Sequence, residues 1–317
     1  QQYSIENEKI QGIYQELLKK TNLLSETQDQ RQIKLFGNLE TFQDIDFLIE
    51  QNATGIGLFR SEYLFFNHQR IPTEEEQFEV YQKIAIQLQK RPFVIRIFDL
   101  SAEKSQLDLD EMNPSLGCRG VRYLLKEKLI LENQIRAVLR ASAYGEIRIL
   151  IPFVADLLEV LEVKKVIEEV KLELKKEKIP FNENILVGCM IEIPSAAIMA
   201  DMIAKEVDFM SIGTNDLAQY TLAADRTSLY ASHFFTTVHP SVLRIIKIII
   251  EAAQKENTPL TLCGEMASDT QSLEILIGMG ITAFSISPRA IPSVKYEIRK
   301  MHYEKLKGLV DQALLVR

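Results

Sequence analysis

The sequence predicts an α/β protein, and two observations favour a closed (β/α)8 TIM barrel. Short apolar stretches alternate with helical segments along the chain, and there are eight of these stretches. They cover residues 34–39, 55–60, 93–98, 148–153, 187–193, 209–213, 260–263 and 283–287. Eight strand-then-helix units are typical of this barrel. A doubly wound open sheet shows the same alternation, because periodicity alone does not reveal whether a sheet closes.

The segments between the strands carry residues that mark helix ends. Asp156 and Glu159 have the spacing of a capping box at the start of a charged helix. Pro240 occupies the first position of an apolar helix, where the missing N–H is not needed. Gly145 and Gly280 follow two further helices, so we expect them to be C-terminal caps.

A single domain accounts for most of the chain. Residues 1–30 are polar, with apolar residues at helical spacing, and predict an N-terminal helical linker. The barrel is expected over residues 31–317, since no internal repeat and no Gly/Ser-rich stretch divides it. The first residue is Gln1 rather than Met, so we expect a longer protein from which this sequence is a part.

Composition limits the classes of function. The 317 residues are 46% hydrophobic and 26% charged, which suits a packed globular protein. A net charge of −7 argues against a nucleic-acid partner. No apolar run is long enough for membrane insertion. The 3 cysteines are too few and too scattered for a disulfide framework or a zinc site, so we expect a cytoplasmic location.

Polar residues recur where the predicted strands end, which is where barrel enzymes place their active sites. These residues are Arg60, Arg96, Glu192, Asn215, Asp216 and Cys263, joined by Arg119 and Arg226 from loops. Arginine binds phosphate and carboxylate oxygens in pairs of hydrogen bonds. Two carboxylates can hold Mg²⁺, and a thiol can donate a proton. The set therefore predicts a site for a small phosphorylated carboxylic acid and Mg²⁺.

Each of these residues also has a purely structural interpretation. An arginine beside a strand usually pairs with a carboxylate, and Glu192 with Arg96 could form an interior ion pair. A single cysteine is more often a small buried residue than an acid catalyst. Glu62 is expected to orient its neighbours rather than bind a ligand. Recurrence at five strand ends favours the functional interpretation for the main set.

Six motifs resemble enzyme I of the bacterial sugar phosphotransferase system. They are GLFRSE at 57–62, NPSLGCR at 113–119, IEIP at 191–194, SIGTNDLAQY at 211–220 followed by DR at 225–226, HP at 239–240, and CGEMA at 263–267. The resemblance runs from about residue 11 to residue 292, with the motifs in the family's order. It implies a barrel that binds phosphoenolpyruvate and is also a dimer interface, so a homodimer is expected.

The resemblance also implies an activity and a role for each site residue. The enzyme would move the phosphoryl group of phosphoenolpyruvate to a histidine of an N-terminal domain that is absent here, leaving pyruvate. That histidine would pass it to a phosphocarrier protein for sugar uptake. By matching motif, Arg60, Arg96 and Arg226 would hold the phosphate, Arg119 and Asn215 the carboxylate, and Glu192 and Asp216 the Mg²⁺. Arg226 and Cys263 would be catalytic, with Cys263 protonating the enolate, and Asp216 would also face the substrate.

One loop departs from the family pattern. The family has Asp-x-Gly-Gly-Asp-Lys after the third strand, whereas this sequence has Asp99-Leu100-Ser101-Ala102-Glu103-Lys104. Lys104, expected near the phosphate, is retained, but both glycines are lost. Two alternatives therefore stay open. One is the pyruvyl domain of a pyruvate phosphate dikinase or phosphoenolpyruvate synthase, and the other is a non-catalytic phosphoenolpyruvate-sensing dimerisation module.

Overall fold

Eight parallel strands close into a barrel in the computed structural model, which describes residues 23–39, 42–68, 70–100 and 113–314. The strands are β1 (Lys34–Leu39), β2 (Ile56–Arg60), β3 (Phe93–Arg96), β4 (Ile147–Ile151), β5 (Leu186–Ile191), β6 (Phe209–Gly213), β7 (Leu260–Cys263) and β8 (Ala283–Ile286). Strand β8 pairs with β1 from Lys34↔Ala283 to Gly37↔Ile286. This pairing closes the sheet, confirms the (β/α)8 barrel and excludes the open sheet.

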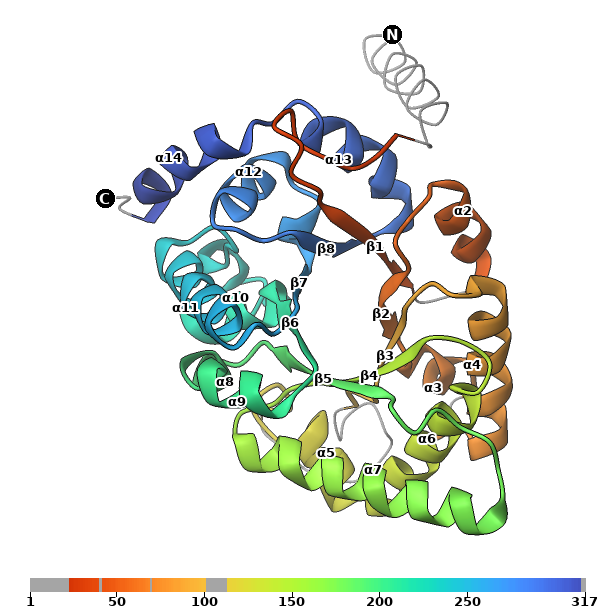
Figure 1. Ribbon diagram of the computed structural model, residues 1–317. Helices are drawn as coiled ribbons and strands as arrows, with labels where there is room; N and C mark the ends of the chain where they lie inside the picture. The colour runs from red at the N-terminus through yellow and green to blue at the C-terminus, as the bar shows by residue number, and fades with distance from the viewer. Residues whose placement is uncertain (1–22, 40–41, 69, 101–112, 315–317) are drawn as a thin grey trace, which may run out of the picture.

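Helices surround the barrel as an outer layer (Figure 1). They are α2 (Ile45–Glu50), α3 (Glu62–His68), α4 (Glu74–Leu88), α5 (Val121–Lys126), α6 (Lys128–Ala141), α7 (Leu157–Glu177), α8 (Pro194–Ile198), α9 (Ala200–Glu206), α10 (Thr214–Leu222), α11 (Pro240–Glu256), α12 (Thr270–Gly278), α13 (Ile291–Ile298) and α14 (Tyr303–Leu314). No helix within the described ranges is long and apolar enough to cross a membrane.

Three of the four predicted helix-end signals are confirmed. Asp156 and Glu159 form a capping box at the start of α7, and Pro240 is the first residue of α11. Gly280, with φ +107°, follows the end of α12 as expected. The prediction for Gly145 was wrong, because α6 already ends at Ala141. A Cβ at position 145 would lie 2.9 Å from the carbonyl oxygen of Ala85, so this glycine permits close packing against α4.

The hydrophobic core has two parts. The larger part fills the space between the strands and the surrounding helices. A smaller cluster inside the barrel consists of Leu58, Val94, Leu150, Met190, Phe209 and Cys263. An eight-stranded barrel leaves only enough interior space for side chains, so this cluster fills the inside of the barrel, with Cys263 at the carboxyl end of β7.

Residues 23–33 lead into β1 along the outside of the barrel. Of the predicted helical linker over 1–30, residues 1–22 lie outside the described residues, and residues 23–30 are not helical. Asp29 accepts hydrogen bonds from the backbone N–H groups of Tyr303 (3.0 Å) and Glu304 (3.2 Å), at the start of α14. These bonds attach the lead-in segment to the last helix.

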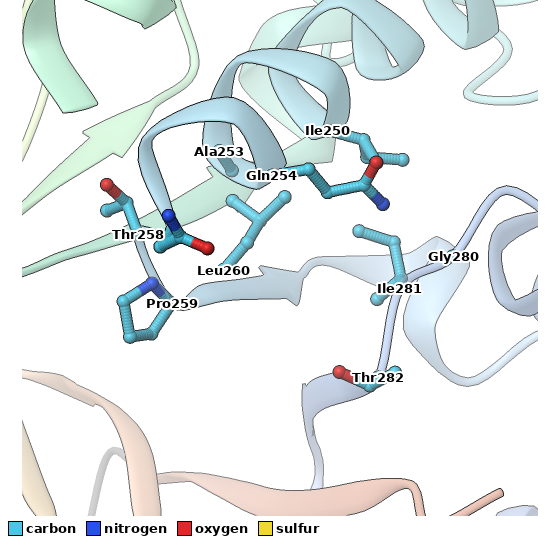
Figure 2. Close-up of a pocket in the computed structure, with 10 residues that line it drawn as sticks. Ile250, Ala253, Gln254, Thr258, Pro259, Leu260, Gly280, Ile281 and Thr282 are labelled. Atoms are coloured by element: carbon cyan, nitrogen blue, oxygen red, sulfur yellow. The ribbon is translucent and has the colours of Figure 1, made fainter.

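Two cavities lie at the amino ends of the strands. One, of about 340 Å³, is lined by Gln254 and Ile250 of α11 and by residues before β7 and β8 (Figure 2). Its lining carries no charged side chain. The other, of about 360 Å³, lies beside the start of β1. Neither cavity contains the polar strand ends, which are at the opposite end of the barrel.

Candidate active site at the carboxyl ends of the strands

The predicted site residues come together at the carboxyl ends of the strands. Arg60 ends β2, Arg96 ends β3, Cys263 ends β7, and Glu192 follows β5 directly. Asn215 and Asp216 are in the first turn of α10, while Arg119 precedes α5 and Arg226 follows α10. Lys104 lies outside the described residues. Strand β3 ends at Arg96 rather than at residue 98, so Asp99 belongs to the loop that leaves the barrel.

Arg96 is held by two buried carboxylates. Its guanidinium lies 3.1 Å from Glu62 Oε1 and 3.5 Å from Asp99 Oδ2. Glu62 also accepts a hydrogen bond of 2.7 Å from the backbone N–H of Asp99, so it orients both residues as expected. Burial lowers the pKa of Arg96, but the neighbouring carboxylates outweigh this effect and raise it above the ordinary value. Arg60 is paired with Arg96 in the β2–β3 register, so two arginines stand side by side.

Arg119 is fixed on three sides. It donates two hydrogen bonds to Asp99, of 3.0 and 2.6 Å, in the forked geometry of a strong arginine–carboxylate pair. A third bond of 3.1 Å goes to the hydroxyl of Tyr220, which itself donates to the carbonyl oxygen of Ser115 at 2.5 Å. The guanidinium also lies 4.4 Å from the ring centroid of Phe153. The loop that carries Arg119 is thereby attached to α10.

Glu192 is a buried carboxylate with a raised pKa. Only 1% of the residue is exposed, and its Oε1 accepts a hydrogen bond of 2.7 Å from the backbone N–H of Phe153. Burial, followed by the nearby carboxylates of Asp216 and Asp99, raises the pKa of Glu192 to about 8. A Cβ at Gly213 would lie 2.7 Å from Glu192 Oε2, so only glycine leaves room for this side chain. Phe153 has φ +57°, an uncommon backbone conformation that directs its N–H at the carboxylate.

Asp216 lies between two arginines, and its negative charge repels that of ionised Glu192. Its carboxylate lies 3.7 Å from Arg119 and 4.0 Å from Arg226. The donor set suits a hard divalent cation, since the mutual repulsion that raises the pKa of Glu192 is relieved when a cation binds both carboxylates. Within the described ranges, no group of three or more His, Cys, Asp or Glu side chains is arranged to hold a metal. Mg²⁺ commonly uses only one or two protein carboxylates and takes its remaining ligands from water and substrate.

Cys263 lies at the mouth of the barrel as an uncharged thiol. Burial is the main cause that raises the pKa of Cys263 to about 11. The thiol donates to the carbonyl oxygen of Ile212 at 3.2 Å and accepts from the Ser211 hydroxyl at 3.8 Å. At neutral pH it therefore keeps its proton, which is the state that a proton donor requires.

Asn215 is positioned by the turn after β7. Its side chain accepts a hydrogen bond of 3.2 Å from the backbone N–H of Glu265 and donates to Glu265 Oε1 at 3.4 Å. Gly264, with φ +105°, makes the turn, and a Cβ there would lie 2.2 Å from Thr214 Oγ1. Glycine is required at this position both for the backbone conformation and for space.

Two residues that hold the site were not singled out from the sequence. Tyr220 lies at the end of the 211–220 motif, so its place in that motif was the available signal. Phe153 had no signal, because its role depends on a backbone N–H and a ring face rather than on its residue type. The suggested ion pair between Glu192 and Arg96 is replaced by separate partners, since Arg96 pairs with Glu62 and Asp99.

The fold and the site together define a (β/α)8 protein in which arginines and buried carboxylates meet at the carboxyl ends of the strands. Arginine side chains are suited to binding anions, and carboxylates are suited to binding Mg²⁺. The chain belongs to the family of PEP-utilising enzymes, PEP-binding domain, whose family model matches residues 15–303.

Curated relatives agree with this assignment, and a solved structure shares the fold. The chain is 44% identical to the phosphoenolpyruvate-protein phosphotransferase of Haemophilus influenzae, over 94% of this chain and 52% of the relative. It is 41% identical to that of Staphylococcus carnosus, over 95% and 53% respectively. The chain thus spans about half the length of these relatives. A citrate lyase structure from Burkholderia xenovorans shares the fold, with TM-score 0.54 and 14% identity over 92% of this chain and 84% of that one.

Proposed function

We propose that this chain is the phosphoenolpyruvate-binding catalytic domain of a phosphoenolpyruvate-protein phosphotransferase. The observation that carries the proposal is the convergence of four arginines with the buried carboxylates of Glu192 and Asp216 at one end of a barrel of this family. The curated relatives from Haemophilus influenzae and Staphylococcus carnosus bear the name of this activity. The phosphoryl group would pass to a histidine of another domain of the same protein and then to a phosphocarrier protein.

The arginines and Asn215 would bind and orient the substrate. Arg60 and Arg96 stand side by side at the ends of β2 and β3, and Arg226 approaches from the loop after α10, so the phosphate would be held by these three. Arg119 and Asn215 would hold the carboxylate group. Phosphoryl transfer depends mainly on positioning and charge neutralisation, which such residues supply.

Glu192 and Asp216 would hold Mg²⁺ and present it to the substrate. When bound, Mg²⁺ would neutralise charge on the phosphate during transfer. Both residues are set rigidly, Glu192 by the Phe153 N–H and Asp216 by the first turn of α10. Asp99, although close, is already engaged by both nitrogens of the Arg119 fork.

Cys263 would complete the reaction by proton transfer. Breaking the bond between phosphorus and the enol oxygen leaves the enolate of pyruvate, and a new phosphorus–nitrogen bond forms on the acceptor histidine. The enolate carbon would take the proton of the Cys263 thiol, whose raised pKa keeps it protonated until then. Solvent would reprotonate the resulting thiolate.

A homodimer is also proposed. The segment between α10 and α11 exposes Leu229 (93%), Tyr230 (88%) and Phe234 (66%), three large apolar side chains close together in sequence. Exposed apolar side chains of this kind are typical of protein interfaces when they form a continuous surface. Sedimentation tests whether this segment forms the dimer interface. The wild type should have the mass of a dimer and the Leu229→Asp/Tyr230→Asp variant that of a monomer. An equal mass for the two proteins would contradict the proposal.

Calorimetric titration with phosphoenolpyruvate, with and without Mg²⁺, tests the main proposal. Saturable binding that Mg²⁺ strengthens is expected for the wild type. A Glu192→Ala/Asp216→Ala variant should lose the effect of Mg²⁺. No binding of phosphoenolpyruvate by the folded wild type under either condition would refute a functional site in this chain and favour a scaffold role.

A further inference from the structure

A buried glutamine outside the site contacts the segment in which the chain leaves β3, from Arg96 to Asp99. Gln134, on α6, is fully buried, and its side chain makes three hydrogen bonds. Its Oε1 accepts from the backbone N–H of Phe98 at 2.8 Å. Its Nε2 donates to Ser61 Oγ at 3.0 Å and to the Tyr81 hydroxyl at 3.2 Å. The amide orientation is determined by this network, because a backbone N–H can only donate.

The hydrogen bond from Phe98 to Gln134 follows directly after the last backbone hydrogen bond between β3 and β4. The N–H of Ile97 still donates to Leu150 of β4, at 3.0 Å. The next backbone N–H, that of Phe98, donates to Gln134 instead of to a neighbouring strand. Gln134 therefore takes the place of a strand partner and sets the direction in which the chain leaves β3.

A second connection reaches Arg96 itself. Ser61, which is bonded to Gln134, donates to the carbonyl oxygen of Arg96 at 2.6 Å. The backbone from Arg96 to Phe98 is thus held at both of its ends through a single amide. Asp99 follows immediately and pairs with Arg119, so the same segment sets the places of both arginines.

We propose that Gln134 is a positioning residue for phosphoenolpyruvate, acting through Ser61 and the Phe98 N–H on Arg96 and Asp99. The inference rests on the proposed function, because it assigns Arg96 to the phosphate. Gln134 does not touch the substrate. Small displacements of a binding group reduce affinity strongly when several groups must act together on one ligand.

The test compares Gln134→Met with a matched control, Gln77→Met. Gln77 is equally buried and also bonds to Tyr81, but its other bond is to the carbonyl oxygen of Pro72, away from β3. Both variants should lower the urea midpoint. Gln134→Met should raise the Kd for phosphoenolpyruvate about tenfold, the equivalent of roughly one net hydrogen bond, whereas Gln77→Met should change it by less than about twofold.

Ser61→Ala provides a second measurement, which also serves if Gln134→Met does not fold. It removes the connection to Arg96 without adding volume and should weaken binding in the same direction. When both variants fold, the effects of Gln134→Met and Ser61→Ala on the binding free energy should be less than additive in the double variant, since both changes act through one segment.

The outcomes separate this inference from the proposed function. A wild type that binds no phosphoenolpyruvate overturns both. A wild type that binds, together with folded Gln134→Met and Ser61→Ala variants of unchanged Kd, overturns only the role of Gln134. Equal weakening by Gln77→Met would also overturn it, because the effect would then reflect general loss of stability.

Discussion

Replacing Glu192 by glutamine should stabilise the protein while it removes a proposed metal ligand. Burial and the carboxylates of Asp216 and Asp99 raise the pKa of Glu192 from 4.5 to about 8 in the folded protein. The unfolded chain releases this proton near pH 4.5, whereas the folded chain retains it up to about pH 8. Over this window the folded state binds more protons, so the free energy of unfolding falls as pH rises.

The magnitude follows from this difference in proton binding. Each pH unit between the two pKa values lowers the free energy of unfolding by roughly 1.4 kcal/mol. The ionisable side chain of Glu192 therefore destabilises the fold by about 3 kcal/mol at pH 7 and by less than about 1 kcal/mol at pH 5. Glutamine has nearly the same shape, and its carbonyl oxygen can still accept the hydrogen bond from Phe153. Glu192→Gln should therefore be more stable than the wild type by about 3 kcal/mol at pH 7 and nearly equal to it at pH 5.

Urea denaturation at both pH values measures this difference. Glu265→Gln is the control, because this exposed carboxylate lies on the same face of the barrel and its replacement should have little effect. Added Mg²⁺ should stabilise the wild type at pH 8 but not Glu192→Gln. A variant that is less stable than the wild type at pH 7, or a difference that does not vary with pH, would refute the reasoning.

Three further predictions concern the loops and the chemistry. Gly120→Ala should lower the free energy of unfolding, measured by urea denaturation, by about 1–3 kcal/mol. Position 120 has φ +57°, and a Cβ there would lie 2.5 Å from Phe153 Cβ. Gly308→Ala is the control and should not be destabilising, because a Cβ at position 308 meets nothing within 4 Å. Cys263→Ala should bind phosphoenolpyruvate normally yet fail to form pyruvate in the complete enzyme, and normal turnover would exclude Cys263 as the proton donor. Arg226→Ala should abolish binding in calorimetry but hardly change the urea midpoint, since the side chain is 38% exposed and its ion pair with Asp216 is long, at 4.0 Å. Normal binding would remove Arg226 from the phosphate site.

The local pattern of residues predicted most of the secondary structure. Apolar runs placed all eight strands, and capping residues such as Asp156 and Pro240 placed helix starts correctly. These features depend on contacts within a few residues, which the sequence displays directly. The recurrence of charges at strand ends also predicted that these side chains gather at one end of the barrel, because a charge in an apolar strand requires a partner or a ligand.

Closure of the barrel and the pairing within the site were decided by the tertiary structure. Open and closed sheets share the same alternation, and only the pairing of β8 with β1 distinguishes them. Arg119 and Tyr220 lie 101 positions apart, and Phe98 and Gln134 lie 36 apart, so no local pattern reveals that they are bonded. Whether Arg96 would pair with Glu192 or with Glu62 and Asp99 also depended on which loops meet at the mouth of the barrel. Residue types therefore determined which chemistry the chain could carry, while long-range packing determined which atoms meet.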